Sequence, residues 1–216
     1  MTTASPPPLL IVFGAGGHGR VVADAALASA NFRAVVASDR DPSLWGQQLL
    51  PGVPIVSPTA LRTLQEPLAL HVAIGNNLVR QKEAQALRDI APLVSVIHPR
   101  ASVAQSSSIA PGCLLAAHCV IGPLAELEQG VIVNHGAVVD HDCRIDAWAH
   151  IAPQAALGGA VRVGAASLVG AGSVVLRDVS IGAGVTLGAG GVALTDVPAG
   201  QSWAGVPARP LERASA

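Results

Sequence analysis

Aliphatic residues recur at every sixth position between residues 103 and 187, without an insertion or a deletion. The row contains fifteen consecutive members, each of them valine, isoleucine or leucine. An α-helix places apolar residues at a spacing near 3.6 and a single strand places them at a spacing of two, so a strict period of six fits neither element. The members of the row are Val103, Ile109, Leu115, Ile121, Leu127, Val133, Val139, Ile145, Ile151, Leu157, Val163, Val169, Val175, Ile181 and Leu187.

The period predicts a prism built from short strands. If each hexapeptide forms one flat face and one turn, three hexapeptides complete a coil, and one aliphatic side chain per face points to the axis. Successive coils then stack at roughly 4.8 Å, the ordinary separation of neighbouring strands. Val103, Ile121 and Val139 would therefore lie one above another. A parallel β-helix fits this pattern, whereas a sandwich of short strands would alternate polar and apolar residues and vary its loop lengths.

Two further positions of the repeat support the prism. The residue two before each aliphatic is mostly small, which suits a narrow interior. The residue directly after it is often Gly, Asn or Asp, which tolerate the positive φ angles of tight corners, so we expect the corners there. Cys113, Cys119 and Cys143 all occupy the small inward position. Their odd number and this placement indicate reduced packing residues in preference to disulfides or metal ligands.

The first hundred residues follow a different pattern, in which apolar runs alternate with glycine-rich or polar segments. An apolar run at 9–13 ends at the glycine-rich loop 14–19, and residues 20–30 have helical spacing. A second predicted strand, 33–38, ends at Asp39, twenty residues beyond the loop. Glycines at the start of a helix let backbone N–H groups approach a phosphate, and an acid at this distance reaches a hydroxyl or a base edge. The arrangement is that of a dinucleotide-binding βαβ unit.

The N-terminal region is long enough for one mononucleotide-binding half of such a fold, whereas a full dinucleotide fold needs two. The sequence predicts an α/β Rossmann-like half-domain over residues 1–98, followed by a β-helix with a C-terminal tail over residues 99–216. A sugar attached to a nucleoside diphosphate fits this half-domain better than NAD does. The further elements expected in it are a strand at 53–56, a helix at 58–65, a strand at 69–74, a helix from 77 to about 90, and a strand at 94–97.

Composition narrows the classes of function. Half of the residues are hydrophobic, yet only two Phe and three Trp are aromatic, as a thin core of Val, Ile, Leu and Ala requires. Thirteen basic and fourteen acidic residues leave the chain nearly neutral, and no basic cluster indicates a nucleic-acid partner. No run of eighteen apolar residues indicates a membrane span. The N-terminus has no basic leader and its apolar run is short, so we expect a cytoplasmic protein.

Histidine is the side chain whose ordinary pKa lies nearest neutrality, and four histidines fall within thirty-three residues of the repeat. His141 lies between Asp140 and Asp142 and two residues after Val139, so we expect it past a corner and pointing outward. One coil later Gly159 occupies the equivalent position, which leaves space for a ligand beside an exposed N–H. A solvent-exposed surface histidine is the simpler alternative. No spacing typical of a tetrahedral zinc site is present, so no metal is predicted. The other three histidines are His118, His135 and His150.

Several motifs together resemble one enzyme family. The hexapeptide row, His141 with its acidic neighbours, and the exit segments 196–200 (DVPAG) and 205–209 (GVPAR) resemble the left-handed β-helix acyltransferases. With the loop 14–19 (GAGGHG) and the segment 73–77 (AIGNN), the chain resembles the sialic-acid and bacillosamine acetyltransferases, which acetylate sugars from acetyl-CoA. This resemblance covers nearly the whole chain. It implies a left-handed coil, an exception to the usual right-handed crossover.

The resemblance implies that the chemistry lies at one corner of the β-helix. His141 matches the catalytic base of the family. Asp142 stands where bacillosamine enzymes have the longer Glu, so either Asp142 or Asp140 orients the imidazole. Gly159 matches a backbone N–H donor to the thioester, which would steady the oxyanion.

The resemblance also implies two ligands and a symmetric assembly. The family fold is a homotrimer with active sites between subunits. Besides Gly159, the residues matched to acetyl-CoA binding are Asn134, His150 and Arg209, the last near the adenosine phosphates. The residues matched to the nucleotide-sugar pocket are Gly16, His18, Gly19, Asp39, Arg40 and Asn76.

These matches lead to a specific hypothesis for the reaction. We expect direct acetyl transfer from acetyl-CoA to the 4-amino group of a nucleotide-linked 4-amino-4,6-dideoxy sugar, with GDP-perosamine as the favoured substrate. Asp39 could accept from the N1 and N2 donors of guanine, whereas uracil offers only its N3 donor, yet the same acid serves either base. O-acetylation of a sugar hydroxyl, an NAD-dependent oxidoreductase suggested by the glycine loop, and a non-catalytic β-helix scaffold remain as alternatives.

Overall fold

Short apolar runs separated by glycine-rich turns form an α/β unit at the N-terminus. The computed structural model describes residues 6–65 and 67–211. The first of two units, Met1–Pro99, contains in chain order β1 (Leu9–Phe13), α1 (Gly17–Ser29), β2 (Ala34–Ser38), η1 (Pro42–Leu44), β3 (Gln48–Leu50), β4 (Val53–Val56), η2 (Ala60–Thr63), β5 (Leu68–Val72), α2 (Asn77–Ala86) and β6 (Val96–Ile97).

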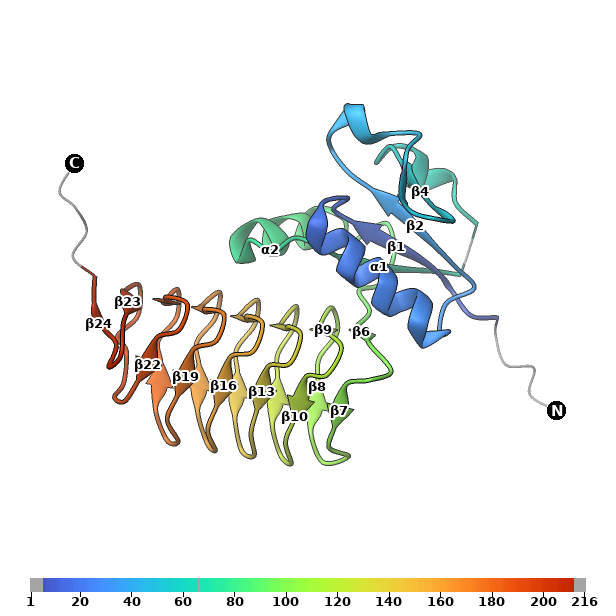
Figure 1. Cartoon of the computed structure of the whole chain (residues 1–216). Coiled ribbons are helices and arrows are strands. Elements are labelled where there is room, and N and C mark those ends of the chain that lie inside the picture. The colour runs from blue at the N-terminus through green and yellow to red at the C-terminus, as the bar shows by residue number, and fades with distance from the viewer. Residues whose placement is uncertain (1–5, 66, 212–216) are drawn as a thin grey trace, which may run out of the picture. The chain divides into compact units, whose positions relative to one another are not determined.

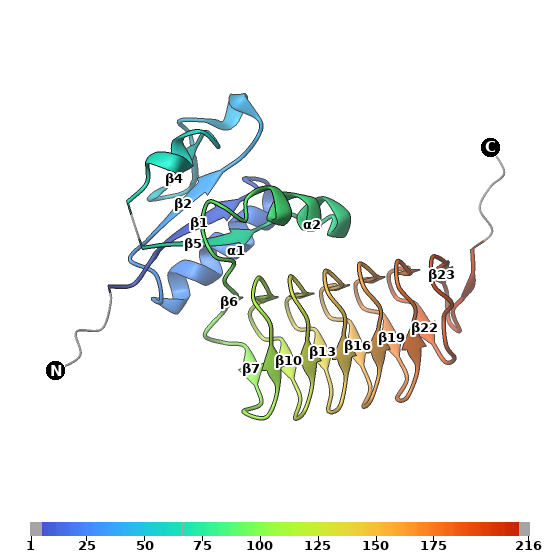
Figure 2. The ribbon, with the colours of Figure 1, turned by 180° about the vertical axis from the view of Figure 1, so that it is seen from behind.

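The sheet of this unit has the strand order β3-β4-β2-β1-β5. All neighbours are parallel except β3 and β4, which pair antiparallel at one edge. The helix α1 covers one face of the sheet and α2 covers the other (Figures 1 and 2). Coverage on both faces explains why residues 10–13 of the central β1 are almost entirely buried. Within the described ranges, no helix combines the length and the apolar character needed to cross a membrane.

The structure corrects the predicted extents of three helices. The helix α1 begins at Gly17, inside the glycine loop and three residues before the predicted start. The helix α2 ends at Ala86, short of the expected residue 90. In place of the helix expected at 58–65 there is only a single 3-10 turn, whose one buried residue is Leu61. A segment with one buried apolar side chain has no apolar face along which a longer helix would pack.

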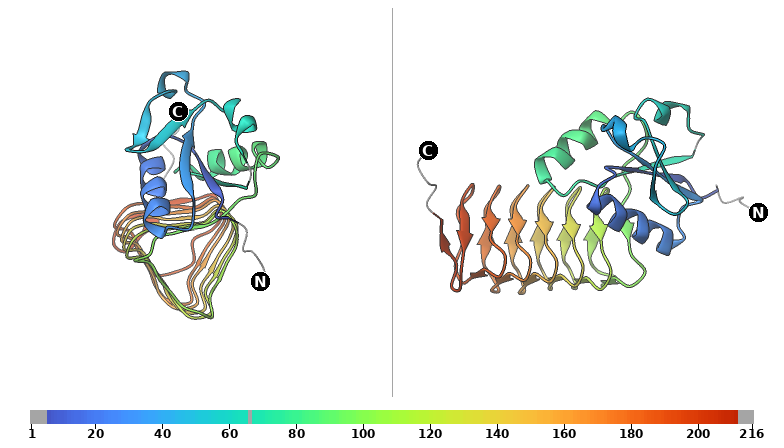
Figure 3. Two further views of the ribbon diagram at one scale, coloured as in Figure 1. Left: turned by 90° about the vertical axis from the view of Figure 1, so that its right-hand side faces the viewer. Right: turned by 45° about the horizontal axis from the view of Figure 1, so that its top comes forward.

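The second unit, Arg100–Ala216, is the prism that the six-residue period predicts. Two-residue strands follow one another six residues apart and stack into three sheets, seen end-on as a triangle in Figure 3. We name the sheet β7-β10-β13-β16-β19-β22 face 1, the sheet β8-β11-β14-β17-β20 face 2, and the sheet β9-β12-β15-β18-β21 face 3. The strands are β7 (Ser102–Val103), β8 (Ser108–Ile109), β9 (Leu114–Leu115), β10 (Val120–Ile121), β11 (Glu126–Leu127), β12 (Ile132–Val133), β13 (Val138–Val139), β14 (Arg144–Ile145), β15 (His150–Ile151), β16 (Ala156–Leu157), β17 (Arg162–Val163), β18 (Leu168–Val169), β19 (Val174–Val175), β20 (Ser180–Ile181), β21 (Thr186–Leu187), β22 (Val192–Ala193), β23 (Ser202–Ala204) and β24 (Arg209–Pro210).

Residues eighteen apart pair in parallel register, as the period predicts. On face 1, Ile121 pairs with Val139, Val139 with Leu157, and Leu157 with Val175. All four side chains are at most 1% exposed, so the aliphatic row forms the interior of the prism. Each coil contributes one aliphatic side chain per face to this core. These side chains are removed from water because neighbouring coils stack on them.

The three cysteines lie at the inward position that the repeat predicts. Cys113, Cys119 and Cys143 are free thiols and fully buried. Burial raises the pKa of Cys119 to about 12 and that of Cys143 to about 11, so both thiols are protonated at neutral pH. They are therefore packing residues and not nucleophiles.

The left-handed corners do not lie directly after the aliphatic row, where we expected them. The positive φ angles fall two residues later, as at Asp142 (58°) and Ala160 (59°). A glycine directly after the aliphatic serves another purpose, since a Cβ on Gly122 would lie 2.6 Å from the backbone nitrogen of His141 in the next coil. At Gly122 the close approach of the next coil leaves no room for a side chain, whereas Glu128 and Leu176 occupy the same repeat position in other coils.

Trp148 occupies a left-handed corner with φ of 63°. A non-glycine residue in this conformation is disfavoured by roughly 1–2 kcal/mol. Its indole lies against Gly130, the corner residue one coil earlier, and only 7% of Trp148 is exposed. A Cβ on Gly130 would overlap three atoms of the ring. The packing of the indole on the glycine offsets the unfavourable backbone of the corner.

Gly130→Ala should therefore destabilise the β-helix more than Gly172→Ala. The two glycines occupy equivalent corners with φ of +69° and +65°, but a Cβ on Gly172 would meet nothing within 4 Å. The backbone effect is shared, and the clash with Trp148 should add about 1–3 kcal/mol for Gly130→Ala. Urea unfolding followed by circular dichroism measures the difference. Equal destabilisation by the two variants would show that Trp148 does not pack on Gly130 in solution.

Candidate active site

His141 lies on the connection from β13 to β14, and its side chain points outward with 57% exposed. The ring Nδ1 lies 2.7 Å from Oδ2 of Asp142. The backbone N–H of His141 donates to Oδ1 of Asp140, also at 2.7 Å. Because a carboxylate only accepts, Nδ1 carries the proton of the neutral imidazole and Nε2 keeps a lone pair. This arrangement leaves Nε2 able to accept a proton.

The two acids beside His141 therefore differ in function. Asp142 holds the ring, whereas Asp140 holds the backbone that carries the ring. Both acids raise the pKa of His141. The hydrogen bond that the ring donates to Asp142 is the largest cause and the charge of Asp140 the next, while burial and the charge of Arg177 oppose them. A raised pKa makes the neutral imidazole a stronger base.

Gly159 occupies the position of His141 one coil later and lies against the imidazole. A Cβ on Gly159 would lie 2.5 Å from both Cε1 and Nε2 of the ring, so only glycine leaves the ring in place. The carbonyl of Gly159 accepts from the N–H of Asp178 at 3.0 Å. Among the described residues, no acceptor bonds the N–H of Gly159. Gly159 itself is buried at the wall of the cavity described next, and its N–H is a backbone donor whose hydrogen-bonding capacity the described residues leave unused.

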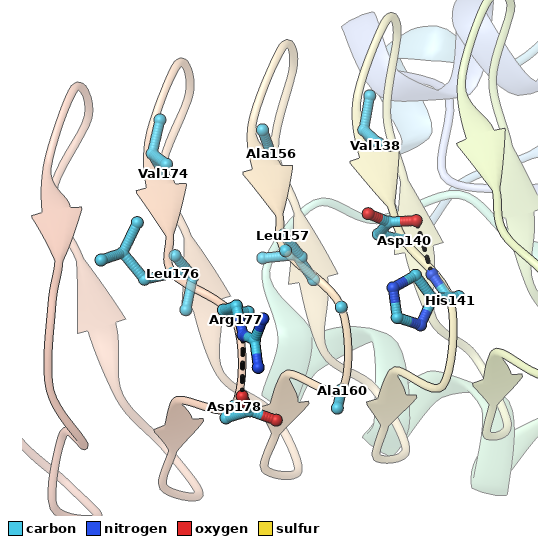
Figure 4. A pocket seen from close by; sticks show the side chains of 13 residues that line it. Val138, Asp140, His141, Ala156, Leu157, Ala160, Val174, Leu176, Arg177 and Asp178 are labelled. Atoms are coloured by element: carbon cyan, nitrogen blue, oxygen red, sulfur yellow. Dashed lines mark hydrogen bonds and ion pairs between the residues drawn. The ribbon is translucent and has the colours of Figure 1, made fainter.

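A cavity of about 610 Å³ lies along face 1 beside these groups. His141 and Asp140 line one end of it, and Arg177 and Asp178 line the other, two coils along (Figure 4). Between them lies the backbone of residues 158–160. Two coil separations amount to roughly 10 Å along the axis. The wall between these two polar ends is mostly apolar, and Val138, Ala156 and Val174 follow one another on neighbouring strands of face 1 in Figure 4.

Asn134 and His150 are paired with each other but do not line the cavity of His141. Oδ1 of Asn134 accepts from the N–H of His135 at 2.9 Å, and Nδ2 lies 3.2 Å from Nε2 of His150. Since an amide nitrogen only donates, Nε2 of His150 is the acceptor in this pair. Asn134 follows β12 and His150 lies on β15, so both belong to face 3. One chain thus does not bring them together with His141.

Arg209 also lies away from His141, at the far end of the repeat. It belongs to β24, which pairs antiparallel with β23, and β23 extends face 3 beyond β21. Its Nη1 donates to the carbonyl of Ala208 at 2.8 Å. Arg209 does not line the cavity of His141. Its proposed contact with the adenosine phosphates of CoA stays a prediction.

A second cavity, of about 400 Å³, lies in the N-terminal unit at the carboxyl ends of β1, β2 and β5. Ligands of open α/β sheets bind at this edge. Four of the six residues predicted for the nucleotide-sugar pocket line it, namely Gly16, His18, Asp39 and Arg40. The other two do not. Gly19 lies under the carbonyl of Gly14, and Oδ1 of Asn76 accepts from the N–H of Val79 at 3.0 Å, which caps α2.

The glycine loop leaves the start of α1 open to a ligand. The N-cap is Gly16, with no side-chain cap and no acidic residue in the first turn. A Cβ on Gly16 or Gly17 would meet nothing within 4 Å, whereas one on Gly19 would overlap the carbonyl of Gly14. The first N–H groups of a helix have no intrahelical acceptor, and the helix dipole makes this end positive. The loop therefore suits an anionic group such as a diphosphate.

Asp39 directly follows β2 at the edge of the same cavity, and two backbone N–H groups hold its carboxylate. Oδ2 accepts from the N–H of Ala15 at 2.7 Å, and Oδ1 accepts from the N–H of Asp41 at 3.0 Å. Each oxygen keeps a second lone pair for a ligand donor. Asp39 therefore links the glycine loop to the β2 edge and presents acceptors of fixed direction.

Comparison with known proteins identifies the family. The acetyltransferase domain of PglB from Neisseria gonorrhoeae, solved in complex with acetyl coenzyme A, is 39% identical to this chain. The match covers 95% of this chain and 100% of that domain, with a TM-score of 0.89. The chain belongs to the hexapeptide-repeat sugar acetyltransferases. The fold expected from the sequence, an α/β half-domain followed by a left-handed parallel β-helix, is confirmed.

Other members of the hexapeptide-repeat sugar acetyltransferases agree with this placement. A histidine-to-alanine mutant of GDP-perosamine N-acetyltransferase from Caulobacter crescentus, solved with CoA and GDP-perosamine, is 36% identical over 98% of this chain and 100% of that chain, with a TM-score of 0.88. The family of the PglD N-terminal domain matches residues 9–87. UDP-N-acetylbacillosamine N-acetyltransferase of Bacillus subtilis is 34% identical over 110 residues, and the match spans 49% of this chain and 50% of that protein.

Sequence reasoning about this acetyltransferase chain missed several cavity residues. Arg177 was overlooked although the eighteen-residue register could have found it, since it follows His141 and Gly159 in the same column. Phe13 and Glu83 also line the second cavity, and no local sequence pattern marks either residue as part of a site. Nearby, the buried guanidinium of Arg80 donates to the carbonyl of Ile74 at 2.9 Å and braces the turn beside this cavity. In the part of the chain that the structure describes, no group of three His, Cys, Asp or Glu side chains could hold a metal ion.

Asp142→Asn should lower the pKa of His141, because the hydrogen bond that the ring donates to the Asp142 carboxylate is the largest cause of its rise. A general base acts in its neutral form, so the acidic limb of the kcat/KM profile should move to lower pH. Asp140→Asn is the matched comparison and should move the limb less. NMR titration of the imidazole together with rates of CoA release measures both quantities. An unmoved limb and an unmoved titration for Asp142→Asn would contradict the pairing of Asp142 with the ring.

Proposed function

We propose that this chain transfers acetyl from acetyl-CoA to the 4-amino group of a nucleotide-linked 4-amino-4,6-dideoxy sugar, with GDP-perosamine as the best candidate. The observation that carries the proposal is the contact of the His141 imidazole with Gly159, whose N–H has no acceptor among the described residues, at the wall of an open cavity. Relatives that match over their full length are named as an acetyltransferase bound to acetyl coenzyme A and as a GDP-perosamine N-acetyltransferase. The relative that binds GDP-perosamine is 36% identical to this chain, and the experiment below tests the nucleotide and the sugar directly.

The proposed chemistry is direct attack of the sugar amine on the thioester carbonyl carbon. Nε2 of His141 accepts the proton that the nitrogen loses as the N–C bond forms, and Asp142 stabilises the resulting imidazolium. The N–H of Gly159 donates to the carbonyl oxygen while negative charge develops on it. The C–S bond then breaks, and the imidazolium returns its proton to the thiolate. The products are the amide, CoA thiol and neutral His141.

The two cavities suggest a division of the substrates between the two units. We assign the nucleotide sugar to residues 1–98, where the open start of α1 suits its diphosphate and Asp39 offers acceptors to its base. We assign acyl transfer to residues 99–216, where the groove of face 1 begins at His141. Neither cavity alone holds both a site for a diphosphate and a general base beside an unused backbone donor.

We further propose a homotrimer in which a neighbouring copy completes each site. In one chain, Asn134 and His150 lie on face 3, away from the cavity of His141. On face 1 and directly after it, the aliphatic side chains of Val174 and Leu176 are 38% and 44% exposed, and a neighbouring copy that covered them would remove apolar surface from water. A head-to-tail contact repeated around a three-fold axis would cover this surface and bring the face 3 pair of one copy to His141 of the next.

His141→Asn should fold and bind both substrates while kcat falls by roughly 10²–10⁴-fold, the usual contribution of a general base. The assay follows CoA release from acetyl-CoA with GDP-, UDP- and dTDP-linked 4-amino sugars and with a 4-hydroxy sugar. His118→Asn is the matched control, because His118 lies at a left-handed corner (φ 63°) that Asn tolerates, outside the cavity. Near wild-type turnover by His141→Asn would remove His141 from the mechanism. Release only with the hydroxy sugar would indicate O-acetylation, and binding of NAD(H) without any nucleotide sugar would indicate an oxidoreductase.

Mixing two impaired variants tests whether sites are shared between copies. His141→Asn and Asn134→Ala, each weakly active alone, should recover activity when co-expressed, because about a quarter of the sites in random trimers join an intact His141 to an intact Asn134. Separately expressed and unmixed proteins are the control. Absence of recovery in purified mixed trimers would mean that both residues act within one copy.

A further inference from the structure

We propose that Arg40 and Glu83 form a planar platform on which the nucleobase of the sugar nucleotide stacks. This inference rests on the proposed function, since it concerns how the second cavity holds its ligand. Arg40 follows Asp39 at the end of β2, and Glu83 lies on α2, so the two residues come from different walls of the cavity. The sequence did not predict that Glu83 lines this cavity, and Glu83 pairs with Arg40 across 43 positions of the chain.

The guanidinium of Arg40 is fixed in its own plane by two parallel hydrogen bonds. Nε donates to Oε1 of Glu83 at 2.8 Å, and Nη2 donates to Oε2 at 2.7 Å. Such a fork restricts rotation of the guanidinium far more than a single contact with lysine would. Beneath it, Cζ of Arg40 lies 5.7 Å from the centroid of the Phe13 ring, and Phe13 is 2% exposed. One side of the guanidinium thus rests near an immobile aromatic ring.

The remaining surface of Arg40 is open to the cavity. Its side chain is 59% exposed, whereas that of Glu83 is only 11% exposed, so the pair presents the arginine and hides the carboxylate. An exposed, immobilised guanidinium plane is a surface on which nucleobases stack. A sugar ring has no flat π face for this plane, and its hydroxyls would bond carboxylates in preference. The nucleobase is therefore the part of the ligand that matches Arg40.

Charge argues against the alternative in which Arg40 binds the diphosphate. Glu83 neutralises the guanidinium, and Asp39 adds a further carboxylate to the lining of the same cavity. A diphosphate at this place would have to displace Glu83 and lie close to two carboxylates. The open start of α1, with no acid in its first turn, is the better anion site. The diphosphate and the base thus occupy different parts of the cavity, and Arg40 serves the base.

Arg40→Lys separates stacking from charge, because lysine keeps the ion pair with the buried carboxylate and loses the plane. We expect the affinity for GDP and UDP, measured by calorimetry on the full chain, to fall by about tenfold or more. The affinity for inorganic pyrophosphate, which has no base, should stay unchanged. Arg144→Lys is the matched control, since Arg144 pairs with Glu126 on face 2 at 3.3 Å, outside both cavities. Thermal unfolding verifies that both variants are folded.

Glu83→Gln provides an independent test, because it should change the affinities for nucleotide and for pyrophosphate in opposite directions. Glutamine keeps one acceptor for Arg40 but removes the neutralising charge and half of the fork. Nucleotide affinity should fall several-fold because the plane loosens, and pyrophosphate affinity should rise because Arg40 becomes available to anions. If the ion pair only stabilised the fold, folded Glu83→Gln would bind the nucleotides and pyrophosphate with unchanged affinities.

The outcomes distinguish this proposal from the proposed function. Wild-type protein that binds GDP or UDP and releases CoA, with Arg40→Lys binding the nucleotides equally well, would overturn the platform and leave the acetyltransferase intact. Parallel loss of nucleotide and pyrophosphate affinity in Arg40→Lys would assign Arg40 to the phosphates and likewise overturn it. Wild-type protein that binds no nucleotide at all would overturn both.

Discussion

The stacking of identical eighteen-residue coils is the constraint on which the β-helix and its site depend. Backbone hydrogen bonds between coils require the same path at every level, so the position of a residue in the repeat decides whether it is inside or outside. His141 is outside because it lies past the strand and before the left-handed Asp142. Gly159 meets its ring because it has the same position one level on. The site is thus produced by register, and no dedicated loop is needed to build it.

The aliphatic row made the fold predictable because its period has only one structural solution, but composition misplaced the corners. Residue type at the left-handed position is a poor signal, since Trp148, Ala160 and Asp142 all occupy it. The corner there follows from the path of the backbone, and inter-coil hydrogen bonds such as that from the N–H of Ala160 to the carbonyl of His141 hold it. The same path resolves which acid orients His141, a question that the symmetrical sequence Asp-His-Asp leaves open.

In the N-terminal unit, the glycine loop predicted the place of the cavity but not the function of each glycine. Gly16 faces open space, whereas Gly19 is needed for the contact of α1 with Gly14, and nothing in a run of glycines separates these cases. The pairing of Arg40 with Glu83 depends on how α2 packs on the sheet, a tertiary contact across forty-three residues that local patterns do not contain. Sequence therefore locates this cavity better than it describes its walls.

The unbroken period also limits how this molecule can change in length. Inserting one residue between two strands would turn every later aliphatic side chain from the axis to the solvent, unless the extra residue loops out at a corner. Only the addition or loss of a whole coil preserves the interior. The separation between His141 and the terminal β23–β24 hairpin can consequently vary only in steps of one coil, roughly 4.8 Å each. A long, flexible co-substrate bound along the prism would therefore have to match one of these discrete distances.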